Sequence, residues 1–252
     1  MAVQPENEAV HRRLREWWDA DAATYDHAAS HSASDPVEAA AWRQALLRHL
    51  PPPPARILDV GAGTGTMSLL AAQLGHHVTA LDLSPRMLAR ASEKADAVGV
   101  DVQTVVGPAD APPEGEFDAV MERHLLWTLP DPVAALKSWG AVSPVVVLYE
   151  GIWRPQDLIG KLEQRAAETI RRLLGNAHDH HAEYDPIMLA ALPFPTGITP
   201  ALVLETLGRA GYGRARIERL RDVEWARRLS EHRILGALES VPRFAVIAKV
   251  SR

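Results

Sequence analysis

The chain of 252 residues is long enough for one large α/β domain, and no second independent domain is required. It contains no cysteine, which excludes disulfides, thiolate metal sites and a cysteine nucleophile. The formal net charge of -5 does not favour a nucleic-acid partner, since such binding is driven by a basic field. Charged residues near the start and short apolar runs also argue against a signal peptide, a membrane span or a membrane partner, so we expect a cytoplasmic protein.

Two helices are expected before residue 51. Residues 6 to 22 place apolar side chains at spacings of three and four, which indicates an amphipathic helix. A second helix is predicted over 37 to 50, because Asp35 and Pro36 supply a cap and a first-turn proline. Four prolines at 51 to 54 end it.

After the prolines, short apolar runs alternate with helical stretches, a pattern typical of a parallel sheet. The expected strands are 56–60, 77–82, 102–106, 118–121, 145–149, 214–220 and 244–250, and the expected helices are 66–74, 84–98, 132–139 and 199 to about 211. The sequence therefore predicts an α/β fold with a Rossmann-like, seven-stranded, mostly parallel sheet and helices on both faces.

Residues 151 to 198 form an insertion after the fifth strand, and part of it follows a helical stripe. Ligands in open α/β sheets bind outside the carboxyl ends of the strands, so a helical cap at this position is placed to cover a substrate. The alternative is a helix that only packs on the sheet.

The first predicted strand leads into a loop with glycines at 61, 63 and 65, and the second strand ends at Asp82. Such a loop lets the backbone approach a nucleotide-like ligand at a helix N-terminus. In the dinucleotide pattern the third glycine would stand at residue 66, where this chain has Thr66. The spacing disfavours an NAD-dependent dehydrogenase and favours a smaller ligand whose ribose hydroxyls donate to Asp82.

These motifs resemble those of the class I S-adenosylmethionine (SAM) dependent methyltransferases, in particular the small-molecule branch. Residues 59–65 are similar to the first motif of the family and residues 81–88 to its second-strand motif, and the resemblance covers residues 55 to 150. It implies SAM as cofactor and S-adenosylhomocysteine (SAH) as product. The four expected parts are N-terminal helical lid elements over 1–50, a SAM-binding core over 51–150, a substrate cap over 151–198, and the rest of the core sheet over 199–252.

The resemblance also implies roles for individual residues. Asp59 and the backbone from Gly61 to Gly63 would hold the methionine part of SAM, Asp82 would bind the ribose, and Leu83 and Met87 would flank the adenine. Asp110 follows the third strand, but its spacing departs from that of the family, since Pro108 and Ala109 stand between Gly107 and Asp110. The full set of expected cofactor-binding residues is Tyr25, Asp59, Gly61, Ala62, Gly63, Asp82, Leu83, Met87, Asp110, Ala111 and Glu122.

His124 follows the fourth strand and is the expected general base, because imidazole titrates near neutral pH and can take a proton from the methyl acceptor. A hydrogen-bonded structural histidine is the alternative. The expected substrate-binding residues are Trp18, Tyr25, His124, Trp127 and Trp153.

The predicted reaction is methyl transfer to a nitrogen or oxygen of a small aromatic or heterocyclic metabolite, with carbon not excluded and a place in specialised metabolism expected. No metal is expected, since adjacent histidines such as those at 178 to 181 in a polar loop are usually solvated. An RNA methyltransferase is disfavoured, because residues 122–125 read Glu-Arg-His-Leu instead of an Asn/Asp-Pro-Pro-aromatic motif. A cyclase or binder on the same fold stays open, and the oligomeric state is expected to be a monomer or homodimer.

Overall fold

The computed structural model describes residues 5–27, 33–153, 162, 165–166, 169–170, 192–194, 197–230, 233–238 and 241–251. Its centre is one seven-stranded sheet in the order β3-β2-β1-β4-β5-β7-β6. All neighbouring pairs from β3 to β5 are parallel, and β7 runs antiparallel to both β5 and β6. The strands are β1 (Arg56–Val60), β2 (His77–Asp82), β3 (Val102–Val106), β4 (Ala119–Arg123), β5 (Val145–Gly151), β6 (Tyr212–Arg219) and β7 (Arg243–Val250).

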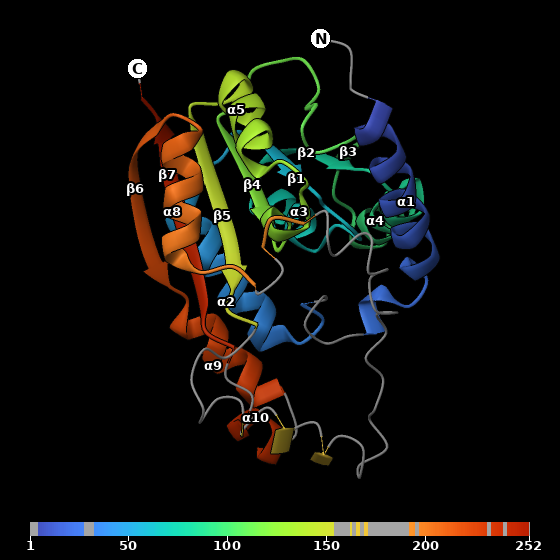
Figure 1. Cartoon of the computed structure of the whole chain (residues 1–252). Coiled ribbons are helices and arrows are strands. Elements are labelled where there is room, and N and C mark those ends of the chain that lie inside the picture. Colours follow the sequence, from blue (N-terminus) through green and yellow to red (C-terminus); the bar gives the residue numbers. More distant parts are fainter. Residues whose placement is uncertain are drawn as a thin grey trace.

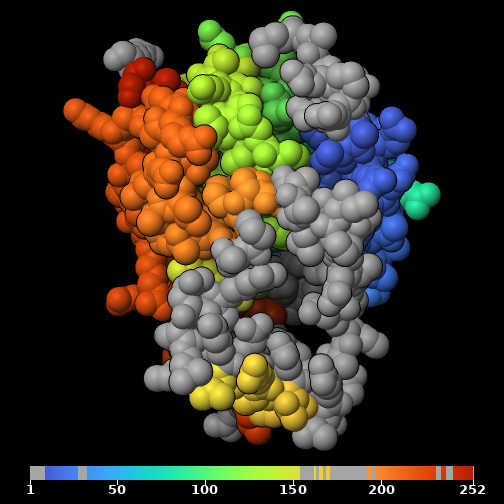
Figure 2. Space-filling view, in the orientation of Figure 1, coloured from blue at the N-terminus to red at the C-terminus, as the bar shows by residue number. Residues whose placement is uncertain are grey.

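Helices cover both faces of the sheet, as Figure 1 shows. Helices α5 and α8 lie on one face, where Figure 2 shows them side by side, and helices α2 and α3 lie on the other. The predicted fold class is confirmed. The helices of the described residues are α1 (Pro5–Asp21), α2 (Pro36–His49), α3 (Thr66–Gln73), α4 (Pro85–Val98), α5 (Pro132–Val142), α8 (Pro200–Arg209), α9 (Arg221–Ser230) and α10 (Arg233–Leu238), with the short 3-10 helices η1 (Tyr25–His27) and η2 (Leu126–Thr128).

Four of these helices begin with the same local signal. A capping side chain accepts a backbone N–H of the first turn, and a proline follows the cap directly. For α2, Asp35 Oδ1 accepts the N–H groups of Val37 and Glu38 at 2.8 and 3.0 Å. Because each signal lies within a few residues of sequence, these helix starts were predictable. The four capping residues are Asp35, Ser84, Asp131 and Thr199.

The central strands are buried on both faces, which explains their nearly continuous apolar sequences. On β1, Leu58 and Val60 face the core shared with α5 and α8, while Ile57 faces the core shared with α2 and α3. Trp42 of α2 and Trp139 of α5 are fully buried, one in each core. The sheet is thus held between two apolar layers.

The boundaries of β4 and β5 differ from the prediction. The sequence analysis ended β4 at 121 and β5 at 149, where charged side chains follow, but the structure continues β4 through Arg123 and β5 through Gly151. Glu122 is still paired with Val60 and Leu148 on the two neighbouring strands. Backbone pairing on both sides therefore extends the strands past the change in side-chain polarity.

Two further parts of the chain are the segment between β6 and β7 and the predicted cap. The sequence analysis placed no element between 220 and 244, whereas α9 and α10 occupy most of that interval. Most of the predicted cap, including 154–161 and 171–191, lies outside the described residues. In the described part of the chain, every helix is too short or too polar to cross a membrane.

Gly65 begins α3 at φ +80°, and a Cβ there would lie 2.7 Å from the Cβ of Ala91 on α4. We expect Gly65→Ala to lower the free energy of unfolding by about 1–3 kcal/mol more than Gly99→Ala, the matched control. Gly99 has a similar φ of +69° but nothing within 4 Å of its added Cβ, so only Gly65→Ala adds a clash to the backbone strain. Urea denaturation measures both losses, and equal losses would contradict the packing argument.

Candidate active site

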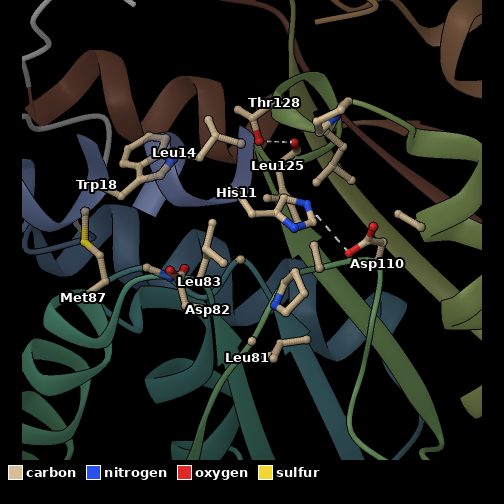
Figure 3. A pocket seen from close by; sticks show the side chains of 18 of the residues that line it. His11, Leu14, Trp18, Leu81, Asp82, Leu83, Met87, Asp110, Leu125 and Thr128 are labelled. Carbon is tan, nitrogen blue, oxygen red and sulfur yellow. Dashed lines mark hydrogen bonds and ion pairs between the residues drawn. The ribbon is translucent and has the colours of Figure 1, made fainter. Parts of the chain in front are cut away.

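A cavity opens beside the carboxyl ends of β1, β2, β3 and β4, bounded on one side by α1 (Figure 3). The sheet places these ends together because the four strands are parallel. The lining residues are His11, Leu14, Trp18, Tyr25, Gly61, Gly63, Leu81, Asp82, Leu83, Met87, Gly107, Pro108, Ala109, Asp110, His124, Leu125, Thr128, Leu129, Pro130, Asp131 and Ala135.

Asp82 joins the two loops on which the sequence prediction rested. Gly63 N donates to Asp82 Oδ2 and Ser84 N donates to Asp82 Oδ1, both at 2.8 Å. Burial raises the pKa of Asp82 to about 6, and the two backbone donors oppose that rise. Each oxygen retains further acceptor capacity, so the carboxylate can also accept hydroxyl groups of a ligand.

The glycine loop lies tightly against the segment after β4. Gly61 has φ +64°, and a Cβ added to it would come within 2.6 Å of Leu125 Cδ1. Gly63, at φ +55°, faces Tyr25 with 3.8 Å between its added Cβ and the tyrosine ring. Both positions favour glycine because of the left-handed backbone, and the missing side chains leave backbone groups facing the cavity.

Asp59 lies beneath this loop and does not line the cavity. Asp59 is only 2% exposed, and Ser68 Oγ of α3 donates a hydrogen bond to Asp59 Oδ2 at 2.5 Å. Burial raises the pKa of Asp59 to about 7, against the effect of the Ser68 hydrogen bond. In this geometry Asp59 ties α3 to β1.

Two polar clusters attach α1 and η1 to the cavity loops. Asp19 Oδ1 accepts hydrogen bonds from Ser84 Oγ and from Arg86 N, which lies 3.3 Å away. Asp26 accepts from Thr64 Oγ1 at 2.6 Å and from Lys94 Nζ at 3.1 Å. The N-terminal segment is therefore fixed to the loops after β1 and β2.

Aromatic side chains from this segment form part of the cavity wall. Trp18 and Tyr25 meet edge to face with 5.9 Å between ring centroids, and both line the cavity. Burial raises the pKa of the Tyr25 phenol to about 12, so the group stays neutral near pH 7. Figure 3 shows Trp18 and Met87 at the same side of the cavity.

The sequence analysis missed His11 and Leu14, which lie on α1 next to Trp18 at spacings of three and four. That spacing was visible in the sequence, but nothing in it said which helix face meets the cavity. His11 Nε2 lies 4.0 Å from Asp110 Oδ1, a contact drawn in Figure 3. Residues 128 to 131, at the end of η2 and directly after it, also line the cavity and were not predicted to do so.

His124 is held in an unusual backbone conformation at the edge of the cavity. Its φ is +61°, and it is the one non-glycine residue with positive φ in the described part of the chain. His124 N donates to Tyr149 O at 2.9 Å, and Leu125 N donates to Glu122 Oε2 at 2.7 Å. Outliers of this kind are concentrated at functional sites, where the surrounding structure holds them in place.

The structure brings most of the predicted site residues together at the cavity. Its lining includes Trp18, Tyr25, Gly61, Gly63, Asp82, Leu83, Met87, Asp110 and His124. The remaining predicted residues, Asp59, Ala62, Ala111, Glu122, Trp127 and Trp153, do not line it. The expected roles of all these residues stay predictions.

The predicted residues outside the lining have other surroundings. Glu122 is fully buried beneath the loop that carries His124, and Trp127 packs against the core formed with α5 and α8. The Trp153 and His124 rings meet edge to face, with 5.1 Å between their centroids. The guanidinium carbon of Arg243 lies 5.5 Å from the centroid of the Trp153 ring.

Among the described residues, no group of three or more His, Asp or Glu side chains is arranged to hold a metal. The histidines at 178, 180 and 181 and Asp179 lie outside the described residues. The expectation that they bind no metal is therefore untested.

Comparisons with known proteins agree with this architecture. A family model described as a methyltransferase domain matches residues 57–143. A ubiquinone biosynthesis O-methyltransferase from Xanthomonas campestris pv. campestris (strain B100) is 36% identical over 182 residues, which cover 69% of this chain and 72% of that protein. The crystal structure of magnesium protoporphyrin IX methyltransferase from Synechocystis PCC 6803 with bound SAM has a TM-score of 0.58 and 15% identity, with 99% of each chain covered. The cyclase SpnF has a TM-score of 0.56 and 17% identity over 84% of this chain and 81% of its own.

The sequence relationship shows that the chain belongs to the class I SAM-dependent methyltransferases, enzymes that use SAM as the methyl donor. The two solved structures, at 15% and 17% identity, show the shared fold. The described residues fit the cofactor, since the backbone at Gly61 and Gly63 adjoins the half-buried carboxyl group of Asp82 and the apolar side chains of Leu83 and Met87.

Asp82→Asn is expected to weaken SAM and SAH binding by about 10- to 100-fold, because hydrogen bonds to a charged group are stronger than those to a neutral amide. In the wild-type protein, SAM affinity should also fall from about pH 7 to about pH 5, as the Asp82 carboxylate with its pKa of about 6 takes up a proton. Asp82→Asn should show a smaller fall. Isothermal titration calorimetry measures both effects.

Asp118→Asn is the matched control for Asp82→Asn. Asp118 Oδ2 likewise accepts a backbone N–H, from Arg56 at 2.7 Å, but it lies at the opposite edge of the sheet. Its substitution should leave SAM affinity unchanged. Wild-type affinity for SAM in Asp82→Asn would show that Asp82 does not contact the cofactor.

Proposed function

We propose that this chain methylates an oxygen or nitrogen of a small aromatic or heterocyclic metabolite. The observation that carries the proposal is His124, a titratable side chain that lines the cavity and is flanked by the indole ring of Trp153. The printed name of the relative from Xanthomonas campestris, an O-methyltransferase of ubiquinone biosynthesis, supports oxygen as one acceptor atom. A place in specialised metabolism stays a prediction.

The proposed cofactor site uses the two loops that Asp82 joins. Asp82 would bind the ribose, the backbone from Gly61 to Gly63 would hold the methionine part, and Leu83 and Met87 would flank the adenine. When bound, SAM supplies a methyl group on a positively charged sulfur. Trp18 and Tyr25 of the N-terminal segment would exclude water from this site, a role supported by their position in the cavity wall.

The proposed role of His124 is to take the proton from the acceptor as methyl transfer proceeds. Methyl transfer needs alignment of an attacking lone pair with the methyl group, and an oxygen or nitrogen that still carries its proton is a weaker nucleophile. His124 is the proposed base because it is a titratable residue that lines the cavity from the loop after β4. No covalent link between the chain and the acceptor is required.

Further proposals concern the parts of the chain, its location and its partners. Residues 1–50 would act as a lid, 51–150 as the SAM-binding core, 151–198 as the substrate cap and 199–252 as the rest of the sheet. The cytoplasmic location, the absence of a nucleic-acid partner, and a monomeric or homodimeric state stay predictions. No observation favours a cyclase or an RNA methyltransferase over small-molecule methyl transfer.

Formation of SAH tests the proposed function directly. The purified chain is incubated with SAM and a panel of phenols, enols, aromatic amines and ring-nitrogen heterocycles, and SAH and the methylated products are measured by mass spectrometry. We expect equal amounts of SAH and methylated product with at least one acceptor. Tight SAM binding without turnover across a broad panel would favour a binder or a cyclase instead.

His124→Asn is expected to lower kcat by about 100- to 10,000-fold with acceptors that are protonated at the assay pH, the usual contribution of a general base. Asparagine tolerates the left-handed backbone at φ +61°, so SAM affinity should be unchanged. The matched control is His77→Asn at the exposed start of β2, distant from the cavity, which should keep wild-type kcat. Steady-state kinetics measures kcat for both variants. An unaltered kcat in His124→Asn would show that His124 is not the general base.

A further inference from the structure

Lys94 of α4 carries a half-buried ammonium group that the proposed function does not use. Its Nζ donates to Asp26 Oδ2 of η1 and to Thr64 Oγ1 of the glycine loop, both at 3.1 Å. The Thr64 hydroxyl donates in turn to Oδ1 of Asp26, at 2.6 Å. A hydroxyl group can donate and accept at the same time, so the three side chains form a closed ring of hydrogen bonds. This ring joins three separate segments of the chain.

The ring is partly withdrawn from water. Thr64 is 1% exposed, and the side chains of Lys94 and Asp26 are 32% and 21% exposed. Burial lowers the pKa of Lys94, and the Asp26 carboxylate opposes this effect. Water and salt screen such a pair less than a pair at the surface, and its charged hydrogen bonds are stronger than neutral ones. The contact is therefore strong enough to hold η1 in place.

Lys94 lies on the face of α4 that meets the cofactor loops. Met87, Ala91 and Lys94 are separated by four and three residues, which places them on one side of the helix. Met87 lines the cavity, and a Cβ added to Gly65 would lie 2.7 Å from the Cβ of Ala91. Lys94 binds Thr64 in the same loop. This face of α4 thus supports the glycine loop, and Lys94 extends that support to η1.

The segment that Lys94 holds carries Tyr25. Tyr25 and Asp26 are consecutive residues of η1, and Thr64 directly follows Gly63 in the glycine loop. Tyr25 and Gly63 both line the cavity, with 3.8 Å between Cε1 of the tyrosine ring and the Cβ position of the glycine. Fixing Asp26 against Thr64 therefore fixes the Tyr25 ring against the loop.

The other attachment of the N-terminal segment acts on α1. Asp19 Oδ1 accepts hydrogen bonds from Ser84 Oγ and Arg86 N at the start of α4. The two helices lie next to each other, as Figure 1 shows. A turn over residues 22–24 separates α1 from η1, so the Asp19 contacts do not determine the position of Tyr25. That position depends on the ring that Lys94 closes.

We propose that Lys94 is the positioning residue of Tyr25, holding its ring against the glycine loop through Asp26 and Thr64 and so keeping the cofactor in its site. This inference rests on the proposed role of Tyr25 in covering the cofactor. It deepens that role by assigning the group that controls how long SAM or SAH stays bound.

Lys94→Met tests the proposal, since it keeps the aliphatic stem and removes the ammonium group. Tyr25 would then lie against the loop for a smaller fraction of the time, and the apparent Kd rises in inverse proportion to that fraction. We expect the Kd of SAH to rise by about 3- to 30-fold, mainly through faster dissociation. Isothermal titration calorimetry measures the Kd and surface plasmon resonance the dissociation rate. An unchanged Kd would overturn the proposal.

Arg90→Met is the matched control. Arg90 lies on the same helix and has an ion-pair contact of the same 3.1 Å length, with Glu93 instead of a residue of the N-terminal segment. Repulsion from Arg90 adds to the effect of burial in lowering the pKa of Lys94, so its loss favours the contacts of Lys94. Arg90→Met should therefore leave SAH affinity unchanged or slightly higher. An equal loss of affinity in the two variants would contradict the proposal.

Amide hydrogen exchange separates positioning from general stability. The N–H groups of Thr24 and His27 donate to backbone oxygens in the turn around Tyr25. In the protein without cofactor, Lys94→Met should speed the exchange of residues 22–27 by about 5-fold or more and leave β1 and β5 at wild-type rates. An equal rise in the strands would show a merely structural role. That outcome, or wild-type exchange over 22–27, would overturn the proposal.

Asp26→Asn tests the same link from its other end and keeps the test decisive if Lys94→Met does not fold. It should also raise the Kd of SAH, because asparagine offers Lys94 no charge. If Lys94 acts through Asp26, the double variant should bind SAH no more weakly than the weaker single variant. Additive losses, or wild-type affinity in Asp26→Asn, would overturn the proposal. These measurements need no methyl acceptor, so their results are distinguishable from failure of the SAH-formation assay, which would contradict the proposed function itself.

Discussion

Parallel pairing of β2, β1, β4 and β5 in register is the constraint on which the rest of the structure depends. Val60 is level with Leu81 on one side and with Glu122 on the other, so all three strands end at one edge. Residues far apart in the sequence consequently meet there. The cavity, the turn at His124 and the contact between the side chains of His124 and Glu150 all follow from this alignment.

At that edge the apolar residues of the two cores give way to acids, of which Asp59, Glu122 and Glu150 are almost fully buried and Asp82 is half-buried. Asp59, Asp82, Glu122 and Glu150 all have raised pKa values, and burial is the main cause in each. Such a concentration of buried acids opposes folding, because each carboxylate loses hydration. Their concentration at a cavity is typical of functional sites, where stability is exchanged for chemical reactivity.

The N-terminal segment completes the site from outside the sheet. Asp19 and Asp26 attach it to loops that the strand ends position, through hydroxyl, backbone and ammonium donors. These contacts are partly buried or exposed, whereas Asp59, Glu122 and Glu150 are almost fully buried. The site therefore combines a rigid floor with a wall held by a small number of polar contacts, which suits a pocket that must exchange a cofactor.

Much of the fold and part of the site were predictable from the sequence. Local signals predicted the strands, the four helix starts marked by proline, the glycine loop and Asp82. A capping side chain bonds to a backbone N–H within three residues, and the glycines at 61, 63 and 65 permit a left-handed backbone. The cavity position of Asp82 followed from the family resemblance of its motif. The α9 helix and the ends of β4 and β5 were missed, since pairing with neighbouring elements decides them.

The sequence by itself determined the type of cofactor site, because the loop that approaches the ligand is encoded in consecutive residues. Only the tertiary structure decided that His11 faces the cavity, that Asp59 turns toward Ser68, and that Glu150 meets His124. Each of these depends on which face an element presents or which strand lies beside it. Such choices result from packing and register between distant segments, and a pattern along one segment contains no information about them.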